Sequence, residues 1–250
     1  SLLSILFIRE ILCFAMLSIG AYYDLKTREV DDGLWMVFGG AGSVLYAWEY
    51  VSGAMADAQI ILVSISLTAV IALALYRYGF FGGADAKALV TISVILPVYY
   101  PLIPFYMHPI TGITVLTNAV LFAMVVPLYN ALSNLVKVAR GERIFECLEE
   151  EPTWRKVLAC FVGTPSNRPI RHHLVIEYSA GEGKKKKFSF RLNYGDDEGY
   201  GSSGNRSCYA RSSTDSKRWL SQNLPFLLFM LAGFLATMLF GDVLLQVLLN

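Results

Sequence analysis

Long apolar stretches alternate with short polar loops over most of this 250-residue chain. A helix rises about 1.5 Å per residue and the hydrocarbon layer is about 30 Å thick, so a membrane-spanning helix needs about 20 mostly apolar residues. Six windows meet or approach this length: 4–23, 34–51, 58–76, 88–103, 110–136 and 224–249. The pattern therefore predicts an α-helical polytopic membrane protein with six transmembrane helices.

Two of these windows contain a proline, which removes a backbone donor from a helix. The fourth window is short and contains Pro97, so it is the weakest of the six. The fifth contains Pro127 and is long enough to tilt or to kink.

A polar segment separates the fifth and sixth windows and cannot lie in lipid, where its backbone groups would lack partners. Within it, residues 173–178 alternate apolar and polar, residues 180–183 form a turn, and Phe188, Phe190 and Leu192 alternate again, which predicts a β-hairpin. The glycine- and serine-rich stretch 195–207 is expected to be a mobile loop. The predicted layout is a membrane domain over 1–136 with helices 1–5, a small α+β domain over 137–222, and a sixth helix within 223–250.

Basic residues in short loops predict the orientation, because such loops stay on the cytoplasmic side. The loops that follow the first and third windows carry Lys26, Arg28, Arg77 and Lys87, whereas loops 52–57 and 104–109 carry no Lys or Arg. We therefore expect the polar domain in the cytoplasm and both termini outside. The run 184–187 of four lysines is interpreted as a solvated hairpin edge that reinforces this topology rather than as a specific anionic-lipid site.

Composition narrows the classes of function. The chain is 55% hydrophobic and 16% charged, which argues against an ordinary soluble enzyme, and its net charge of +1 gives no reason to expect a nucleic-acid partner. The four cysteines form no C-x-x-C pair, which argues against a zinc ribbon or a disulfide scaffold. We expect the lipid bilayer as a partner, and no metal or small-molecule cofactor.

Two aspartates stand at window ends that the predicted topology places at the same membrane face. Asp24 closes the first window and Asp85 opens the fourth, 61 positions later. Two carboxyl groups in contact share a proton, so that one can take a proton from water while the other gives one to a carbonyl oxygen. This pairing predicts aspartic-protease chemistry with Asp24 and Asp85 as the catalytic residues.

Plain structural roles are the alternatives for both aspartates. Asp85 could be the N-cap of the fourth helix, with Gly82 and Gly83 forming the turn before it, and this is the favoured interpretation of that residue taken alone. Asp24 could pair with Lys26 or Arg28, but a helix C-terminus disfavours a negative charge by about 0.3–1 kcal/mol, so capping does not explain it.

The segments Asp24-Leu25-Lys26-Thr27-Arg28-Glu29-Val30 and Gly82-Gly83-Ala84-Asp85-Ala86-Lys87 resemble the two motifs of the type IV prepilin peptidases, the G-x-G-D intramembrane aspartyl proteases. Archaeal preflagellin peptidases match best, with six spans and a cytosolic domain ahead of the last one. The resemblance implies that Asp24 and Asp85 are catalytic, with Gly82, Gly83, Ala84 and Lys87 supporting them. Ala84 departs from the family pattern, which has a second glycine at that position.

The resemblance also implies a substrate class. Preflagellin or type IV prepilin-like precursors would lose a short basic leader just before their hydrophobic helix, at the cytoplasmic membrane face. Glu29, Asp31 and Asp32 would contact the basic leader, although Asp31 and Asp32 are also explained as solvated turn residues that begin the second helix. The paired cysteines of the bifunctional bacterial relatives are absent, so N-methylation of the product is not expected.

Other classes remain as alternatives. An ion- or proton-coupled transporter would use intramembrane acids such as Glu10, Glu49 and Asp242, but each is more simply a solvated residue at a helix end, and Arg9 is expected to pair locally with Glu10 or to reach the interface. A membrane-anchored scaffold would use its polar domain to bind a partner. A presenilin-like enzyme would share the Tyr-Asp pair that ends at Asp24, but the chain lacks a Pro-Ala-Leu segment.

Overall fold

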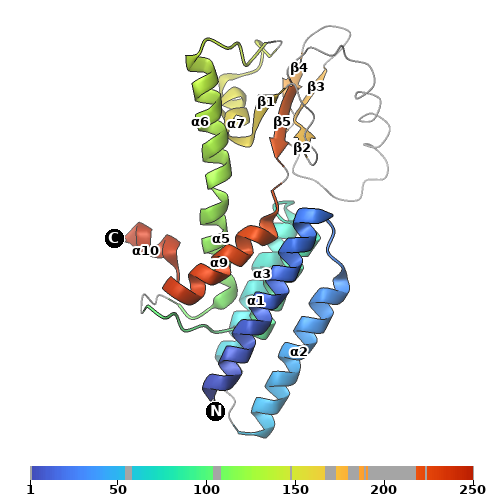
Figure 1. The fold of residues 1–250 in the computed structure, drawn as a ribbon, viewed down its shortest axis with the longest axis vertical. Coiled ribbons are helices and arrows are strands. Elements are labelled where there is room, and N and C mark those ends of the chain that lie inside the picture. Colours follow the sequence, from blue (N-terminus) through green and yellow to red (C-terminus); the bar gives the residue numbers. More distant parts are fainter. Residues whose placement is uncertain are drawn as a thin grey trace. The chain divides into compact units, whose positions relative to one another are not determined.

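The computed structural model describes residues 2–53, 58–103, 108–146, 148–166, 173–179, 186–188, 190, 218–222 and 224–249. The described part is mostly helical with a few short strands (Figure 1). Its elements in chain order are α1 (Leu2–Lys26), α2 (Asp32–Val51), α3 (Ala58–Arg77), α4 (Gly83–Ile95), α5 (Thr111–Ala123), α6 (Val125–Ala139), α7 (Thr153–Val162), β1 (Gly163–Ser166), β2 (His173–Val175), β3 (Glu177–Ser179), β4 (Lys186–Phe188), β5 (Arg218–Gln222), α9 (Phe226–Phe240) and α10 (Val243–Leu249).

The chain forms two compact units. The apolar unit comprises residues 1–123 and 225–250, and the polar unit comprises residues 124–224. Helix α6 groups with the polar unit, although the sequence analysis assigned residues up to 136 to the membrane domain. Amide contacts explain this grouping, because Asn134 of α6 donates to the carbonyl oxygens of Cys160 at 2.9 Å and of Gly163 at 2.8 Å.

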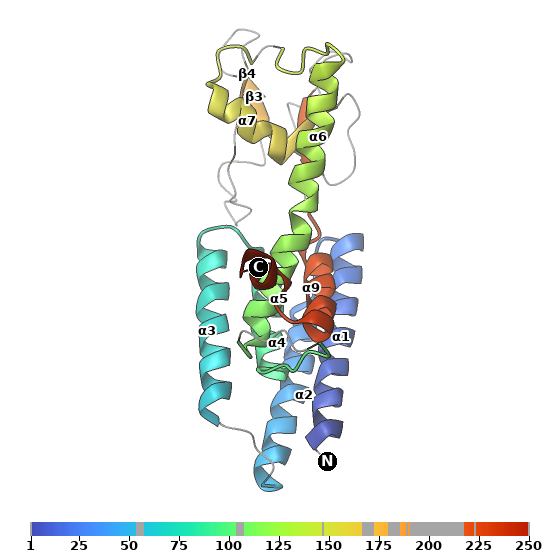
Figure 2. The same ribbon diagram turned by 90° about the vertical axis from the view of Figure 1, so that its left-hand side faces the viewer.

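Helix α4 lies at the centre of the apolar unit, where it contacts α1, α2, α3, α5 and α9. The long helices α1, α2 and α3 run in roughly the same direction, and α9 crosses α1 obliquely (Figures 1 and 2). The core is built from fully buried apolar side chains of α1, α4 and α9, among them Met16, Leu17, Leu89, Ile92, Leu227 and Met230. The hydrophobic core of this unit therefore lies around α4.

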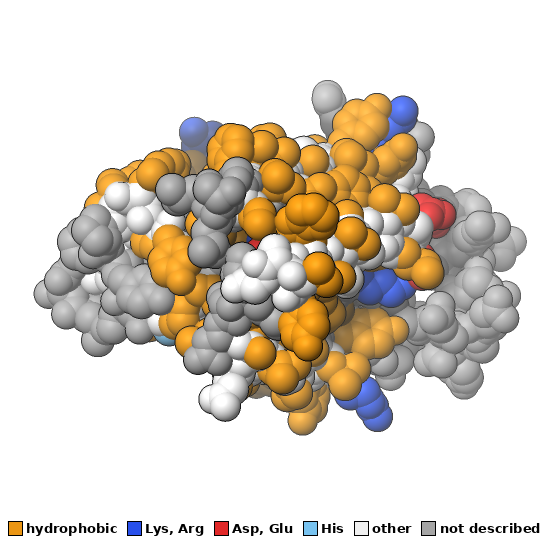
Figure 3. All heavy atoms as spheres, turned by 90° about the horizontal axis from the view of Figure 1, so that it is seen from below, with side chains coloured by type: hydrophobic (Ala, Val, Ile, Leu, Met, Phe, Trp, Pro, Cys, Tyr) orange, Lys and Arg blue, Asp and Glu red, His pale blue; other side chains and the backbone are white. Residues whose placement is uncertain are grey.

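The outer surface of the apolar unit is also hydrophobic. Side chains such as Met36, Val44, Leu62 and Leu73 are each more than 60% exposed. Orange apolar side chains dominate the described atoms in the view from below (Figure 3). A helical unit that is apolar on both its inner and outer faces fits lipid and not water.

Three helical stretches in the described residues are long and apolar enough to cross a membrane: Ile5–Lys26, Ala58–Arg77 and Thr111–Ala139. The first two agree with the predicted first and third windows. The third covers the fifth window and is interrupted at Met124, three residues before Pro127. Because Pro127 lies in the first turn of α6, its missing N–H leaves the carbonyl of Ala123 without its helical donor, which accounts for the break.

The fourth window is only partly helical, which corrects the prediction of a helix over 88–103. Helix α4 ends at Ile95, two residues before Pro97, because proline disfavours helical backbone in the residue before it and lacks an N–H of its own. The chain then continues in extended form, with a bridge between Val98 and Ile110. The backbone N–H of Leu102 donates to the carbonyl oxygen of Met238 in α9 at 3.1 Å, so this segment runs beside the end of α9.

The sixth window also differs from the single helix predicted over 224–249. Helix α9 ends at Phe240, and Gly241 takes a left-handed φ of 79° before α10 begins. Glycine tolerates this conformation without steric cost. The short helix α10 then turns away from α9 (Figure 1).

The polar unit has its own small core. Helix α7 begins directly after Pro152, and the buried side chains of Ile144, Leu148, Phe188 and Trp219 pack beneath it. The indole N–H of Trp219 donates to the carbonyl oxygen of Ile144 at 3.1 Å. The unit thus combines helices with a small amount of sheet.

The strands of the polar unit form two antiparallel sheets. One has the order β1-β5-β2 and the other pairs β3 with β4, opposing Glu177 to Phe188, where the sequence predicted a hairpin. The predicted single strand over 173–178 is instead broken at the buried Ile176, so that its halves join different sheets. The predicted turn at 180–183, the first two lysines of the 184–187 run, Leu192 and the loop 195–207 lie outside the described residues.

Candidate active site

Asp24 lies in the last turn of α1, and its side chain is 15% exposed. The guanidinium Nη1 of Arg28 is 3.6 Å from its Oδ1, so the predicted alternative partner Arg28 is the one the structure supplies. The backbone N–H of Leu227, in the first turn of α9, lies close to the Asp24 carboxyl group. A helix N-terminus offers such N–H groups to an anion, so α9 offsets the unfavourable position of Asp24 at the end of α1.

Asp85 is the third residue of α4 and is not its N-cap, which corrects the capping interpretation. Gly82 is the N-cap, and Asp85 Oδ2 accepts a hydrogen bond from the Gly82 N–H at 3.1 Å. This backward bond is one half of a capping box, and the other half needs a cap side chain that glycine lacks. Asp85 therefore satisfies one backbone donor and keeps further acceptor capacity.

Asp24 and Asp85 belong to two helices that are in contact, α1 and α4. Asp85 lies in the electrostatic field of both Asp24 and Arg28. The like charges repel and the guanidinium attracts, so three ionisable groups form one electrostatic unit. The catalytic role that the sequence analysis expected of Asp24 and Asp85 stays a prediction.

Gly82 is needed for the room that it leaves beside Asp85 and not for an unusual backbone conformation. Gly82 has an ordinary φ of −71°, but a Cβ built on it would lie 3.3 Å from Asp85 Oδ2. Any larger residue would press on that carboxylate. A Cβ on Gly83 would meet only Tyr76, at 3.9 Å, and Ala84 packs against the hydrophobic core.

Lys87 has a partner in α2 rather than in the acid pair. Its Nζ is 2.6 Å from Asp32 Oδ1, and this ion pair joins α4 to α2 while remaining well exposed to solvent. Asp31 is the N-cap of α2 and accepts from the Gly33 N–H at 2.6 Å. Glu29, Asp31 and Asp32 are all exposed, as turn residues would be.

Comparison with known proteins now adds to this geometry. Residues 11–128 match the model of the type IV leader peptidase family. A preflagellin peptidase of Methanocaldococcus jannaschii is 23% identical over 254 aligned residues, covering 94% of this chain and 94% of that protein. The resemblance predicted from the two motifs is confirmed. The findings support a membrane-bound peptidase that cleaves leader peptides.

The segment that matches the leader peptidases contains both aspartates, but part of their surroundings lies outside it. Leu227 belongs to α9, far beyond residue 128. Sequence reasoning missed this backbone donor, because main-chain N–H groups leave no residue-type signal. Only the apolar character of the last window indicated that a helix would be available to pack near Asp24.

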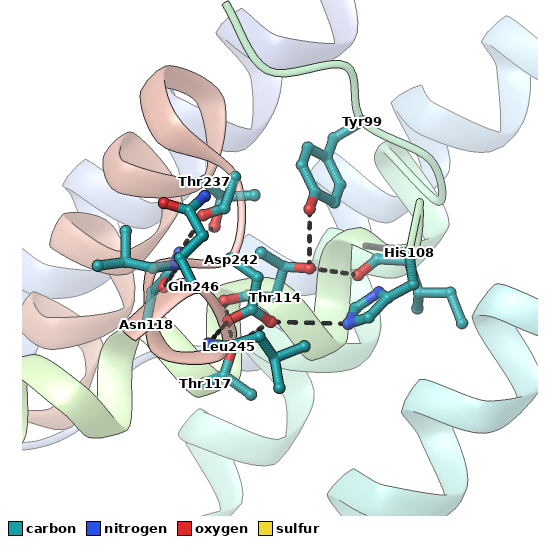
Figure 4. A network of polar contacts seen from close by, with 12 residues as sticks. Tyr99, His108, Thr114, Thr117, Asn118, Thr237, Asp242, Leu245 and Gln246 are labelled. Atoms are coloured by element: carbon teal, nitrogen blue, oxygen red, sulfur yellow. Dashed lines mark hydrogen bonds and ion pairs between the residues drawn. The ribbon is translucent and has the colours of Figure 1, made fainter. Parts of the chain in front are cut away.

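Another buried acid in the apolar unit lies outside the matched leader peptidase segment. Asp242 is fully buried, which corrects its interpretation as a solvated end residue. Its Oδ1 accepts from the Leu245 N–H at 2.9 Å, its Oδ2 accepts from the Thr117 hydroxyl at 3.0 Å, and His108 Nε2 is 3.6 Å away (Figure 4). Nearby, Asn118 donates to the carbonyl oxygen of Gly241 at 2.9 Å. Asp242 thus joins α5, α10 and the 108 region.

Arg9 pairs with Glu49 of α2 and not with Glu10, a further correction. Its Nη2 is 2.9 Å from Glu49 Oε2, and the side chains are 5% and 9% exposed. Nη1 donates to the carbonyl oxygen of Ile95 at 2.6 Å, and the guanidinium stacks 3.9 Å from the centre of the Tyr46 ring. Because α4 ends at Ile95 and the Tyr99 N–H donates to the carbonyl oxygen of Pro109 instead, the Ile95 carbonyl has no helical donor, and Arg9 supplies one.

Proposed function

We propose that this protein is an intramembrane aspartyl endopeptidase. It removes the short basic leader from preflagellin or type IV prepilin-like precursors at the cytoplasmic membrane face. The observation that carries the proposal is the placement of Asp24 and Asp85 in one electrostatic unit, inside the segment that matches the leader peptidase family. The named relative, a preflagellin peptidase, supports the substrate class.

The proposed chemistry needs only the two carboxyl groups and water. One ionised carboxylate takes a proton from water, whose oxygen attacks the carbonyl carbon of the scissile peptide, while the protonated partner donates to the carbonyl oxygen. Collapse of the resulting diol breaks the C–N bond and transfers a proton to the leaving amine. No other reactant enters.

Partial exposure of the site supports access of a peptide and of water. The Asp24 side chain is 15% exposed and Gly82, beside Asp85, is exposed. A precursor whose hydrophobic helix lies in the bilayer presents its leader junction at the membrane surface, the depth at which α1 ends and α4 begins. The site therefore requires no unfolding of α4 to be reached.

The acidic residues that follow α1 suit a basic leader. Glu29, Asp31 and Asp32 are exposed on the turn between α1 and α2, a few residues from Asp24. Asp32 already holds Lys87, so a leader lysine or arginine would share or exchange that partner. Such a contact would act mainly on binding of the precursor, since it is remote from the reacting bond.

The decisive experiment is cleavage of a preflagellin-like precursor by the full-length protein in membranes. We compare the wild type with Asp24→Asn and Asp85→Asn and use mass spectrometry to locate the cut. Each variant should lose at least about a thousandfold in kcat, as removal of a member of a catalytic pair does in other enzymes. Cutting should lie just before the hydrophobic segment.

Glu10→Gln is the matched control, because it also removes a carboxylate from α1 but lies outside the site. It should cleave like the wild type. Unchanged cleavage by both Asn variants would refute the aspartyl mechanism, whereas a wild type that does not cut would refute the substrate class. Proton or ion flux into proteoliposomes that stops in Asp24→Asn would favour the transporter instead.

A further inference from the structure

The turn that ends α1 has an unusual backbone conformation. Among the residues that the structure describes, Arg28 is the one non-glycine residue with a positive φ, at 63°. The turn is fastened by Thr27, whose N–H donates to the carbonyl oxygen of Tyr23 at 2.8 Å and whose hydroxyl donates to that of Glu29 at 2.9 Å. The chain thus folds back immediately after the helix.

Glycine is the usual residue at this left-handed position after a helix, because a Cβ is sterically unfavourable there. Arg28 therefore holds a strained conformation that glycine would relieve. Such strain points to a use for the side chain. Folding the chain back at Arg28 returns its guanidinium to Asp24, one helical turn earlier.

The Arg28 side chain is held inward instead of extending into water. It is 19% exposed, and its Nη1 lies 3.6 Å from Asp24 Oδ1. A long basic side chain near a membrane surface normally extends its charge to water. Lys26, two residues earlier, does so: it is exposed, with its Nζ 3.3 Å from the Tyr22 hydroxyl.

Arg28 acts on both aspartates. Asp85 experiences the repulsion of Asp24 and the attraction of Arg28. Lys87, the basic residue nearest to Asp85 in sequence, is turned to Asp32 instead. One guanidinium therefore offsets the repulsion that would otherwise separate the two carboxyl groups.

We propose that Arg28 is the positioning residue of the acid pair: its guanidinium offsets the repulsion between Asp24 and Asp85 and so keeps both in one site. It acts on the reaction through the two carboxyl groups and not on the reacting bond itself. This inference rests on the proposed peptidase function. In the sequence analysis, Arg28 served as one of the basic loop residues that predict which side of the membrane the loop is on. The proposal gives it a role in the site.

The experiment compares Arg28→Gln, Arg28→Lys and Arg28→Gly with Lys26→Gln, which removes a neighbouring charge that does not face the aspartates. Arg28→Gln should lower kcat about tenfold to a hundredfold with KM nearly unchanged, because misplaced reacting groups affect the chemical step. Arg28→Lys should restore most of the activity, since it keeps a positive charge on a side chain long enough to face Asp24. Lys26→Gln should behave as the wild type.

Arg28→Gly separates positioning from folding. It relieves the left-handed strain, so thermal unfolding should occur at the same or a higher temperature, and yet kcat should fall as in Arg28→Gln. A lower melting temperature that parallels the loss of kcat would overturn the proposal in favour of a structural role. Faster cleavage by Arg28→Gln would overturn it too, because Arg28 would then obstruct the site.

A second readout does not depend on cleavage. Infrared spectroscopy of the wild type should contain a carboxylate stretching band that disappears in Asp24→Asn. This band should shift in Arg28→Gln, return in Arg28→Lys and stay in place in Lys26→Gln. An unshifted band in Arg28→Gln would refute the coupling, whereas a shifted band in a protein that does not cut the precursor would refute the proposed substrate and leave the coupling standing.

Discussion

The apolar unit contains two kinds of carboxylate. Asp242 is fully buried, and its two oxygens accept from Leu245 and Thr117 with His108 close by. Asp24 and Asp85 are partly exposed and lie in each other's electrostatic field, and Arg28 pairs with Asp24 and acts on Asp85 through its charge. A carboxylate whose acceptors are all engaged by protein groups is committed to holding helices together, whereas a pair kept close against its own repulsion is available for chemistry. The contrast separates structural acids from candidate catalytic ones.

Among the structural ion pairs and hydrogen bonds, the buried pair of Arg9 with Glu49 should contribute most to stability. Arg9→Met would leave Glu49 buried without its ion-pair partner, which lowers the free energy of unfolding by about 3–5 kcal/mol. The double variant Arg9→Met with Glu49→Leu should recover most of the loss, because no isolated charge remains. Urea unfolding in detergent micelles measures both. A single variant as stable as the wild type would show that the pair does not hold α1 to α2.

Asp242 sharpens the comparison directly. Asp242→Ala should lower the free energy of unfolding by about 1–3 kcal/mol, since it strands the Leu245 N–H and leaves the Thr117 hydroxyl with the carbonyl oxygen of Thr114 alone. Asp242→Asn keeps an acceptor for Leu245 and should lose less. Cleavage per folded molecule should stay unchanged in both. A loss of kcat at normal stability would place Asp242 among the catalytic groups and break the contrast.

A substitution at Gly82 tests whether the position of the Asp85 carboxylate matters for cleavage. Gly82→Ala brings a Cβ to within 3.3 Å of Asp85 Oδ2, so the carboxylate must shift by a few tenths of an ångström, and kcat should fall about tenfold. The control is Gly40→Ala, because a Cβ there meets nothing within 4 Å. Steady-state cleavage measures both variants. Equal activities would mean that the position of Asp85 tolerates this shift.

The ion pair of Lys87 with Asp32 should matter least. Both side chains are well exposed, at 49% and 68%, and exposed pairs contribute about 0–1 kcal/mol. Lys87→Met should therefore lower the free energy of unfolding by no more than about 1 kcal/mol. The difference should vanish at about 1 M salt, where the Debye length is about 3 Å. A larger, salt-independent loss would assign Lys87 to the core of the α2–α4 contact.

The long apolar helices could be predicted from the sequence to within three residues, as α1, α2 and α3 demonstrate. Their ends depend on local polarity alone. Pro97 marked the fourth window as weak, but the contacts made at the two interruptions could not be predicted: Arg9 binds the last carbonyl of α4, and Asn118 binds the carbonyl of Gly241 after α9. Those partners are distant in sequence.

The candidate site divides in the same way. The positions of Asp24 and Asp85 could be predicted because each stands in a recognisable short motif at the end of an apolar window. The partners of the surrounding residues could not: Lys87 reaches Asp32, and the amide of Leu227 reaches Asp24. A backbone donor carries no residue signature, and a lysine has several acidic residues within reach.

The contacts of α9 also set an order of events during synthesis. The N–H groups of Leu102 and Ile103 donate to the carbonyl oxygens of Met238 and Leu239. The backbone N–H of Leu227 lies close to the carboxyl group of Asp24. All three donors or acceptors on α9 leave the ribosome after the whole polar unit has been translated. The apolar unit therefore cannot close, and Asp24 cannot reach its final surroundings, until α9 has been made and has packed against α1 and α5, so a nascent chain stalled before residue 226 carries both aspartates in an unfinished site.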